Sequence, residues 1–548
     1  MKVRKKIGTL ALILMMTTTG LVGCGGKQSS ETDPYKVLAN KNARQAIQLA
    51  INRQELCDVI LGNGSIPAKY YTGTDLVKED GKDYTDLLKD AGVDKSITDV
   101  DKAKELWKKA KEEVGFDKVE IQIMTEDLEL TQKQAEFYQA QLQDALEGLT
   151  VTIHQIPFKQ QLQNQEKRNY QISMSGWVPD YPDPLTFLDT MVTGKQYAGQ
   201  TGYSDKEYDK LIDQAKHESD RKKSWDIYAN AEEKMLDEAN LIPIFQPTNA
   251  ILQKPEVKGL VITKFGAKTQ FKWAEGKNKQ INLYEAADIP TLDVSKVSDT
   301  TSSGVLINVM EPLCRIDEKG DATPGIAESW TTSEDGLTWT FKIRDGVKWT
   351  NGDKITAKDF EYSWKRTLDP KTKSTYGWIM YDIVGAEEAN TKGGDAVDKV
   401  GVKALDDNTL EVKLVRPVTY FDKLTYDVRF LPLNKKYVES KGDKYGTTKE
   451  DTIYCGPFSL DTWKMEDQFS IIKNPSYWDA STVKLDRVNY KIVKDSNAAL
   501  NLYENGDIDR VGLTADQVDK YKNDPNLTHM NNASVYSLQI NASGKNGR

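Results

Sequence analysis

The first half of the chain alternates between segments with helical and strand-like spacing of apolar residues. Over 41–60, apolar side chains recur on one helical face, at Ala43, Ala46, Ile47, Ala50 and Ile51, and the helix is predicted to end at Gly62, Gly64 and Pro67. Further helices are predicted at 99–114, 130–147, 204–218 and 220–239, and short apolar strands at 119–124 and 149–156. Helices that alternate with strands indicate an α/β lobe built on a central sheet.

The second half begins with a different pattern. Residues 334–353 place Trp339, Phe341 and Ile343 at alternate positions, so one face of an extended segment is apolar. Asp-Gly pairs at 335–336 and 345–346 and an Asn-Gly pair at 351–352 supply turns. We therefore predict a β-meander here, followed by a helix that is capped by Thr356 and stopped by Pro370.

The chain starts with the pattern of a secretory leader. Basic residues precede an apolar run that is too short to span a bilayer stably, which is typical of a signal peptide over 1–23. The run ends in LVGC at 21–24, which matches the bacterial lipobox, in which the cysteine is lipidated. An ordinary signal peptide with a chance cysteine is the alternative, but the flexible segment after Cys24 fits a tether better. We expect lipidation of Cys24 and anchoring on the extracytoplasmic face of the cell membrane.

Composition narrows the class of function. A chain of 548 residues implies two or three domains, and its net charge of −9 argues against a nucleic-acid partner. Cys57, Cys314 and Cys455 are widely separated and show no metal-ligand spacing. We find no phosphate-binding loop and no motif of zinc proteases, serine hydrolases or dinucleotide-binding enzymes. The sequence therefore predicts no metal, no cofactor and no catalytic site.

The segment GWVPDYPDP, residues 176–184, is a candidate binding segment. Its prolines fix the backbone and remove hydrogen-bond donors, so the segment is stiff and irregular. It places Asp180 between Trp177 and Tyr181. One interpretation is a loop acid beside two half-buried aromatic residues. The other is a ligand clamp, in which Asp180 meets a positive charge in a partly dry pocket.

Three stretches together resemble one family. They are GIAESWTTSEDGLTWTFKIRDGVKWTNGDKITAKDFEYSWKR (325–366), NKNARQAIQLAINRQEL (40–56) and GWVPDYPDPLTFLDTM (176–191). They are similar to the signature region, a helix and the ligand-contacting loop of bacterial extracellular solute-binding proteins of the oligopeptide/dipeptide class, family 5. The resemblance implies a two-lobed α/β fold of the periplasmic-binding-protein (flytrap) type with an additional inserted domain. It also implies a monomer that captures oligopeptides and delivers them to the permease subunits of an ABC importer.

The resemblance assigns roles to individual residues. Asp180 would receive the ammonium group of a peptide ligand, and the backbone of Gly176, Trp177 and Val178 would pair with its main chain. Ser298, Asp299 and Thr300 would form the facing backbone strand. We add four aromatic residues as candidates for the pocket wall: Phe158, Tyr376, Trp378 and Tyr536. Where some relatives hold the carboxylate of a short peptide with Arg and His, this chain departs from the pattern with Met174 and Glu129, so the resemblance implies neither a ligand length nor a clamp for that carboxylate.

The order of the two halves differs from that of the family. The half with GWVPDYPDP follows the signal peptide directly, and the half with WTFKIRDGVKW, which the family places first, comes second. We interpret the chain, from this order, as a circular permutant. Permutation does not by itself forbid folding, because cuts in exposed loops are tolerated. After the signal peptide and a tether over 24–35, one lobe would comprise 36–248 with 534–541, the other 249–310 with 431–533, and an inserted domain 311–430.

Other functions remain open at this point. A surface receptor for a signalling peptide would share the same chemistry. A binder of a non-peptide ligand on the same fold is less favoured, because Asp180 is present and histidine is scarce.

Overall fold

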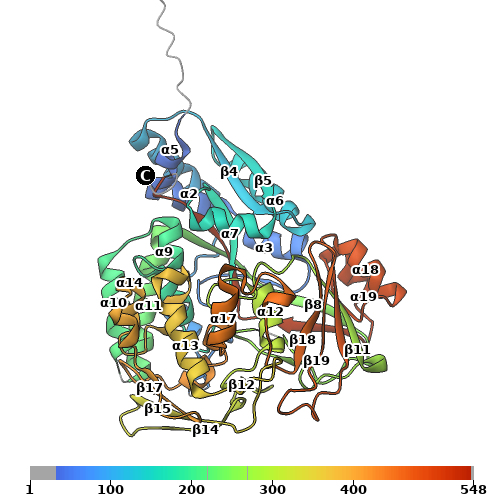
Figure 1. Ribbon diagram of the computed structural model, residues 1–548. Coiled ribbons are helices and arrows are strands. Elements are labelled where there is room, and N and C mark those ends of the chain that lie inside the picture. The colour runs from blue at the N-terminus through green and yellow to red at the C-terminus, as the bar shows by residue number, and fades with distance from the viewer. Residues whose placement is uncertain (1–31, 80, 219, 268, 545–548) are drawn as a thin grey trace, which may run out of the picture.

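The protein forms a two-lobed α/β molecule in its computed structural model, which describes residues 32–79, 81–218, 220–267 and 269–544 (Figure 1). The predicted signal peptide and Cys24 lie outside these residues. The expected two-lobed α/β architecture is confirmed. Across the described ranges, we find no helix with both the length and the apolar character that crossing a membrane requires.

The upper lobe in Figure 1 is built on a six-stranded sheet. Its strands, in spatial order, are β1 (Ile66–Pro67), β7 (Leu241–Gln246), β23 (Val535–Ile540), β6 (Ile172–Trp177), β4 (Val119–Glu126) and β5 (Leu149–Ile156). Strand β4 runs parallel to β5 and β6, whereas β23 runs antiparallel to both β6 and β7. The last strand of the chain therefore lies between strands from the first half.

The helices of this lobe follow the predicted apolar periodicity. They are α1 (Pro34–Ala39), α2 (Lys41–Ala50), α5 (Val100–Val114), α6 (Glu129–Ala145) and α7 (Phe158–Glu166). Asn40 and Asp99 cap α2 and α5 by accepting backbone hydrogen bonds, and Gly115 ends α5 with a positive φ of 80°. The helix predicted over 41–60 is interrupted, because the side chain of Asn52 accepts a hydrogen bond from the N–H of Glu55 and starts a new short helix, α3 (Arg53–Glu55). A π-helical turn at Leu56–Leu61 completes the segment.

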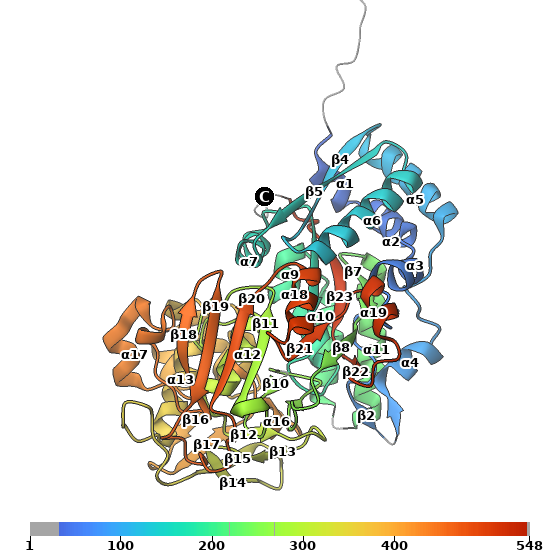
Figure 2. The same ribbon diagram turned by 90° about the vertical axis from the view of Figure 1, so that its right-hand side faces the viewer.

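Within the described residues, the rest of the molecule contains two four-stranded sheets and one three-stranded sheet, besides pairs of short strands. The first has the order β11 (Gln280–Glu285), β20 (Arg487–Ile492), β19 (Gln468–Lys473), β18 (Phe458–Lys464), and the second β14 (Ala327–Thr332), β15 (Thr338–Ile343), β17 (Thr409–Lys413), β16 (Val402–Ala404). The third is β21 (Arg510–Gly512), β8 (Thr248–Gln253), β22 (Leu527–Asn531). The major helices here are α10 (Lys206–His217), α11 (Arg221–Glu238), α12 (Thr300–Val309), α13 (Ala357–Leu368), α17 (Lys435–Lys441) and α18 (Ser496–Asn505) (Figure 2).

The predicted meander over 334–353 is only partly correct. Trp339, Phe341 and Ile343 are buried on one face of β15, as expected. However, β15 pairs with β14 before it and with β17, more than sixty residues later, and the segment after Ile343 forms turns instead of a further strand. The Asp-Gly pair at 335–336 therefore joins the two strands of the hairpin, and the pairs at 345–346 and 351–352 form the turns that follow it. The helix after Thr356 is confirmed as α13, which ends at Leu368, just before Pro370.

The chain passes between the six-stranded and three-stranded sheets at two places. One passage is at Pro247, between β7 and β8, and the other is at 532–534, between β22 and β23. The passages are joined by hydrogen bonds from Gln246 Nε2 to the carbonyl of Asn532 (2.9 Å) and from Thr248 Oγ1 to Asn531 Oδ1 (3.1 Å). Gly73 packs against them so closely that a Cβ at this position would lie 1.9 Å from the carbonyl oxygen of Ala533. The two connections between the six-stranded and three-stranded sheets thus lie side by side.

Candidate ligand-binding site

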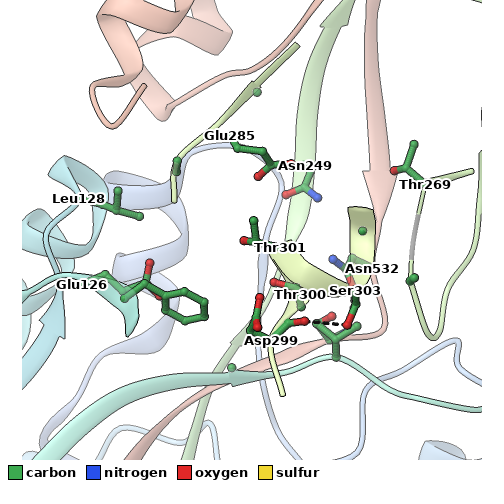
Figure 3. Close-up of a pocket in the computed structure, with 18 of the residues that line it drawn as sticks. Glu126, Leu128, Asn249, Thr269, Glu285, Asp299, Thr300, Thr301, Ser303 and Asn532 are labelled. Carbon is green, nitrogen blue, oxygen red and sulfur yellow. Dashed lines mark hydrogen bonds between the residues drawn. The ribbon is translucent and has the colours of Figure 1, made fainter. Parts of the chain in front are cut away.

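A cavity of about 750 Å³ lies between the upper lobe, with its six-stranded sheet, and the rest of the molecule, and both line it. The upper lobe contributes the end of β4, the start of α7, the end of β6 and Tyr536 of β23. The other side contributes the end of β11, the start of α12 and β21. In Figure 3, Glu126 and Leu128 lie on one side of the view, across from Asp299, Thr300 and Thr301.

The structure brings nearly all the predicted ligand residues to this cavity. Those that line it are Gly176, Trp177, Val178, Asp180, Ser298, Asp299, Thr300, Phe158, Tyr376 and Tyr536. They come from positions up to 378 residues apart in the chain (158 to 536). Met174 and Glu129 stand where some relatives are expected to hold a peptide carboxylate. Met174 lines the cavity, while Glu129 accepts a hydrogen bond from Ser496 Oγ (3.2 Å).

Trp378 differs from the prediction. Its ring packs against Tyr376 at a centroid distance of 4.9 Å and contributes to a separate, much smaller cavity with Tyr381 and Asp382. Lys195 lies over the Trp378 ring at 5.5 Å. Tyr376 occupies the wall position, and Trp378 therefore supports that wall from behind.

The segment around Asp180 is fixed by its own hydrogen bonds. The backbone N–H of Asp180 donates to Thr186 Oγ1 (2.8 Å), and the preceding Pro179 carbonyl accepts from the N–H of Gly266 (2.7 Å). Asp183, the second acid of the segment, accepts from the N–H of Leu185 (3.0 Å) and does not line the cavity. The stiffness expected from the prolines is thus reinforced, and Asp180 is held in one place with 6% of its surface exposed.

Asp180 is part of a buried charge cluster. Its carboxylate lies 3.3 Å from Arg429 Nη2 and accepts a hydrogen bond from the Tyr376 hydroxyl (3.0 Å). The same guanidinium lies 3.0 Å from Asp427, another buried carboxylate that lines the cavity. Two carboxylates thus share one cation, and the cluster carries one net negative charge when both are ionised.

The pKa values of both carboxylates are raised, chiefly by burial. Burial raises the pKa of Asp180 to about 7, although Arg429 opposes the shift. Burial likewise raises the pKa of Asp427, again against the effect of Arg429. One guanidinium does not fully offset the loss of solvation of two carboxylates. A second cation placed beside Asp180 would stabilise its ionised form.

Aromatic rings hold the cluster in position. The Arg429 guanidinium lies 3.6 Å from the centroid of the Tyr376 ring, which stacks on Trp177 at 5.9 Å with an interplanar angle of 2°. Trp177 in turn packs edge-on against Tyr197, whose hydroxyl donates to the carbonyl of Gly176 (2.9 Å). Stacking limits the motion of a guanidinium that has to satisfy two acids.

The ligand-facing part of β6 has an open edge. Its pairing with β4 extends only through Ile172 and Ser173, so among the described strands none covers this edge from Ser175 onward. On the other edge, Gly176 pairs with Tyr536 of β23. A Cβ at Gly176 would come within 3.0 Å of the Tyr536 ring, which explains why a glycine suits this position. An extended ligand could add to the open edge.

Several cavity residues were not found from the sequence. They are Glu126, Asp427, Arg429, Glu285 and Arg510. The stretch TYDVRFLPL contained one signal, since Asp427 and Arg429 interrupt an otherwise apolar run. Nothing in the pattern connected these residues to Asp180, which lies 249 positions away from Arg429.

Comparison with known proteins identifies the family. Residues 5–199 and 321–546 match the model of the bacterial extracellular solute-binding proteins, family 5 (middle). The chain belongs to this family. The resemblance read from the sequence is thereby confirmed, and family 5 is by description a family of solute-binding proteins of the cell exterior.

Curated relatives match about half of the chain. The dipeptide-binding protein of Lactococcus lactis subsp. cremoris (strain MG1363) is 37% identical over 53% of this chain and 52% of its own length. The oligopeptide-binding protein OppA of Bacillus subtilis (strain 168) is 39% identical over 45% of this chain and 46% of its own. The chain thus spans about half the length of the curated relatives it matches.

A solved structure gives a similar coverage. The substrate-binding domain of an oligopeptide ABC transporter from Bacillus anthracis str. Ames is 47% identical over 45% of this chain and 48% of that chain, with a TM-score of 0.44.

Proposed function

We propose that this family 5 protein binds peptides with a free N-terminus in the cavity between its lobes, with Asp180 as the partner of the terminal ammonium group. The observation that carries the proposal is the buried cluster of Asp180, Asp427 and Arg429, which has one negative charge in excess. The names of the relatives, which bind dipeptides and oligopeptides, support the same ligand class.

The rest of the cavity suits a peptide main chain. The open edge of β6 can pair with an extended ligand, which would be held without reading its side chains. The facing residues 298–300 are not the predicted strand, because Asp299 caps helix α12 and Thr300 begins it. A buried ammonium left without a carboxylate would cost about 3–5 kcal/mol, so Asp180 supplies the charge that such a ligand needs. Binding in this arrangement requires no chemical conversion of the peptide.

The test compares free and N-acetylated forms of one peptide by calorimetry. We expect the wild type to bind the free peptide at least about 100-fold more tightly, because acetylation removes the charge that pairs with Asp180. Asp180→Asn should lose this preference. Asp183→Asn is the matched control, since Asp183 lies in the same segment but outside the cavity. Equal affinity of the wild type for both peptides would refute the proposal.

We further propose that the protein is anchored through a lipid on Cys24 and passes its ligand to the permease of an ABC importer. The support for the anchor is the LVGC sequence at 21–24 and the polar segment that follows. Cys24→Ser should move the protein from the membrane fraction to the soluble fraction, or leave its leader uncleaved. A variant that is processed and retained on the membrane like the wild type would contradict the anchor.

The exchanged order of the halves is also a proposal. It is supported by β23, which completes the first-half sheet, and by relatives that each align with about half of the chain. A variant with residues 280–544 placed before residues 36–277 should bind the same peptides with similar affinity. A variant that folds but binds none of them would argue against the permuted order.

A further inference from the structure

The charges that line the cavity are unequal in number and in pairing. Among the described residues, its lining holds five acids and three bases: Glu126, Asp180, Glu285, Asp299 and Asp427 against Arg429, Lys494 and Arg510. Arg429 is shared by Asp180 and Asp427, and Lys494 pairs with Asp127, outside the lining (2.7 Å). The Asp299 carboxylate caps α12 by accepting from the N–H of Ser302 (2.7 Å). Glu126 and Glu285 are the two acids of the lining whose partners are still to be described.

Glu285 has a cation in its neighbourhood. Burial raises the pKa of Glu285 to about 7, and Arg510 is the charge that opposes this shift. The two residues face the same part of the cavity from β11 and β21. Glu285 is therefore partly compensated by the protein itself.

Glu126 has no such compensation. Its carboxylate makes no hydrogen bond or ion pair with any residue in the described ranges, although its backbone carbonyl accepts from Thr131 Oγ1 (2.8 Å). Burial raises the pKa of Glu126 to about 7, and the next largest influence is the like charge of Asp127. Glu126 is half-buried at the cavity wall, so a bound ligand that displaces its remaining water would leave the carboxylate without a partner unless the ligand supplies a cation or a donor.

The surroundings of Glu126 suit a long side chain with a charged end. Leu128 and Phe158 line the same cavity, and the ring of Tyr536, which is 44% exposed, stacks on Phe245 at 4.9 Å. Tyr536 and Glu126 both line this cavity. Apolar and aromatic surfaces accommodate the aliphatic stem of lysine or arginine, and an aromatic ring attracts the cationic end.

We propose that Glu126 makes the cavity selective for peptides that carry a lysine or arginine side chain a few residues after the N-terminus. The inference rests on the proposed function, because it assumes that the ligand's ammonium sits at Asp180. Glu126 and Asp180 then hold two separate positive charges of one ligand. Glu126 is a specificity residue, and the general affinity for peptides comes from Asp180 and the backbone contacts.

The experiment uses pentapeptides of alanine with a free N-terminus, in which one position from 2 to 5 is either lysine or norleucine. Norleucine has nearly the same length and apolar stem as lysine but lacks the charge. The measured quantity is the ratio of the dissociation constants of the norleucine and lysine peptides, for the wild-type protein, Glu126→Gln and Glu120→Gln. Glu120 is the matched control, because it is exposed on the same strand, β4, outside the cavity.

We expect one position at which the wild type prefers lysine by about 10- to 100-fold, the range for a hydrogen bond to a charged group. Glu126→Gln should bring this ratio near 1, and Glu120→Gln should keep it. A wild type that binds the pentapeptides without preferring lysine at any position overturns the inference and leaves the proposed function intact, as does a preference that survives in Glu126→Gln. Absence of binding to every peptide defeats both.

Discussion

Replacement of Arg429 by methionine should destabilise the cavity in a strongly pH-dependent way. The substitution keeps much of the apolar volume but removes the one cation that Asp180 and Asp427 share, at 3.3 Å and 3.0 Å. At an effective dielectric constant of about 20, each pair contributes roughly 5 kcal/mol of Coulomb attraction. Because desolvation offsets much of this attraction, we expect a net loss of about 3–5 kcal/mol in the free energy of unfolding at pH 8.

The sign of the pH dependence follows from the raised pKa values. In the variant, the pKa of both carboxylates in the folded state should lie above the values of the native protein, where burial already raises that of Asp180 to about 7. An acid whose folded pKa is above its unfolded pKa of about 4 destabilises the folded state when it is ionised. The loss relative to the native protein should therefore be complete only above the folded pKa of the variant, and it should shrink as the pH falls from that value toward the folded pKa of the native protein.

The loss in the free energy of unfolding is measured by urea denaturation at pH 8, 6.5 and 5.5, with tryptophan fluorescence as the signal. Arg366→Met is the control, because Arg366 pairs with a single carboxylate, Asp293, which keeps Lys296 at 3.6 Å. The double variant Arg429→Met/Asp427→Asn should recover part of the stability at pH 8. An equal loss at pH 8 and pH 5.5, or no recovery in the double variant, would refute the shared-cation reasoning.

Three further outcomes are expected. Peptide affinity should fall by up to about tenfold for each pH unit below about 7, because the ligand needs Asp180 in its ionised form. In calorimetric titrations, Asp180→Asn should remove this dependence of affinity on pH. Gly73→Ala should lower the melting temperature, because its Cβ would lie 1.9 Å from a carbonyl oxygen, whereas Gly199→Ala, with open space around it, should not. Gly176→Ala should weaken peptide binding several-fold by displacing the ring above it, which a Cβ would approach to 3.0 Å; unchanged affinity would contradict that contact.

Local patterns were sufficient for much of the fold. The helices α5, α10 and α11 and the strands β4 and β5 lie within one or two residues of their predicted ranges, because their periodicity and caps are encoded in adjacent residues. The partner of β15 could not be predicted this way. Its second neighbour, β17, enters from more than sixty residues away, and turn residues alone cannot show where the next strand comes from.

In the site, too, some features were visible in the local sequence and others arise only from distant segments. The stiff segment around Asp180 was visible in its prolines and aromatic residues, but its interpretation as a clamp depended on what lies opposite. Arg429 interrupts an apolar run and Glu126 precedes Asp127, but neither sequence context connects these residues to Asp180. Their importance arises from burial and from the pairing or isolation that the tertiary fold imposes.

The neighbouring passages at Pro247 and 532–534 restrict how the molecule can deform. The two adjacent connections are joined by hydrogen bonds from Gln246 and Thr248, and Gly73 packs against them. We expect such a pair to bend readily about the line that runs through both connections, but to resist twisting and sliding. The relative placement of the two lobes is then described by a single opening angle. A partner that touches both lobes could therefore sense whether the cavity is filled from that angle alone, without contacting the ligand.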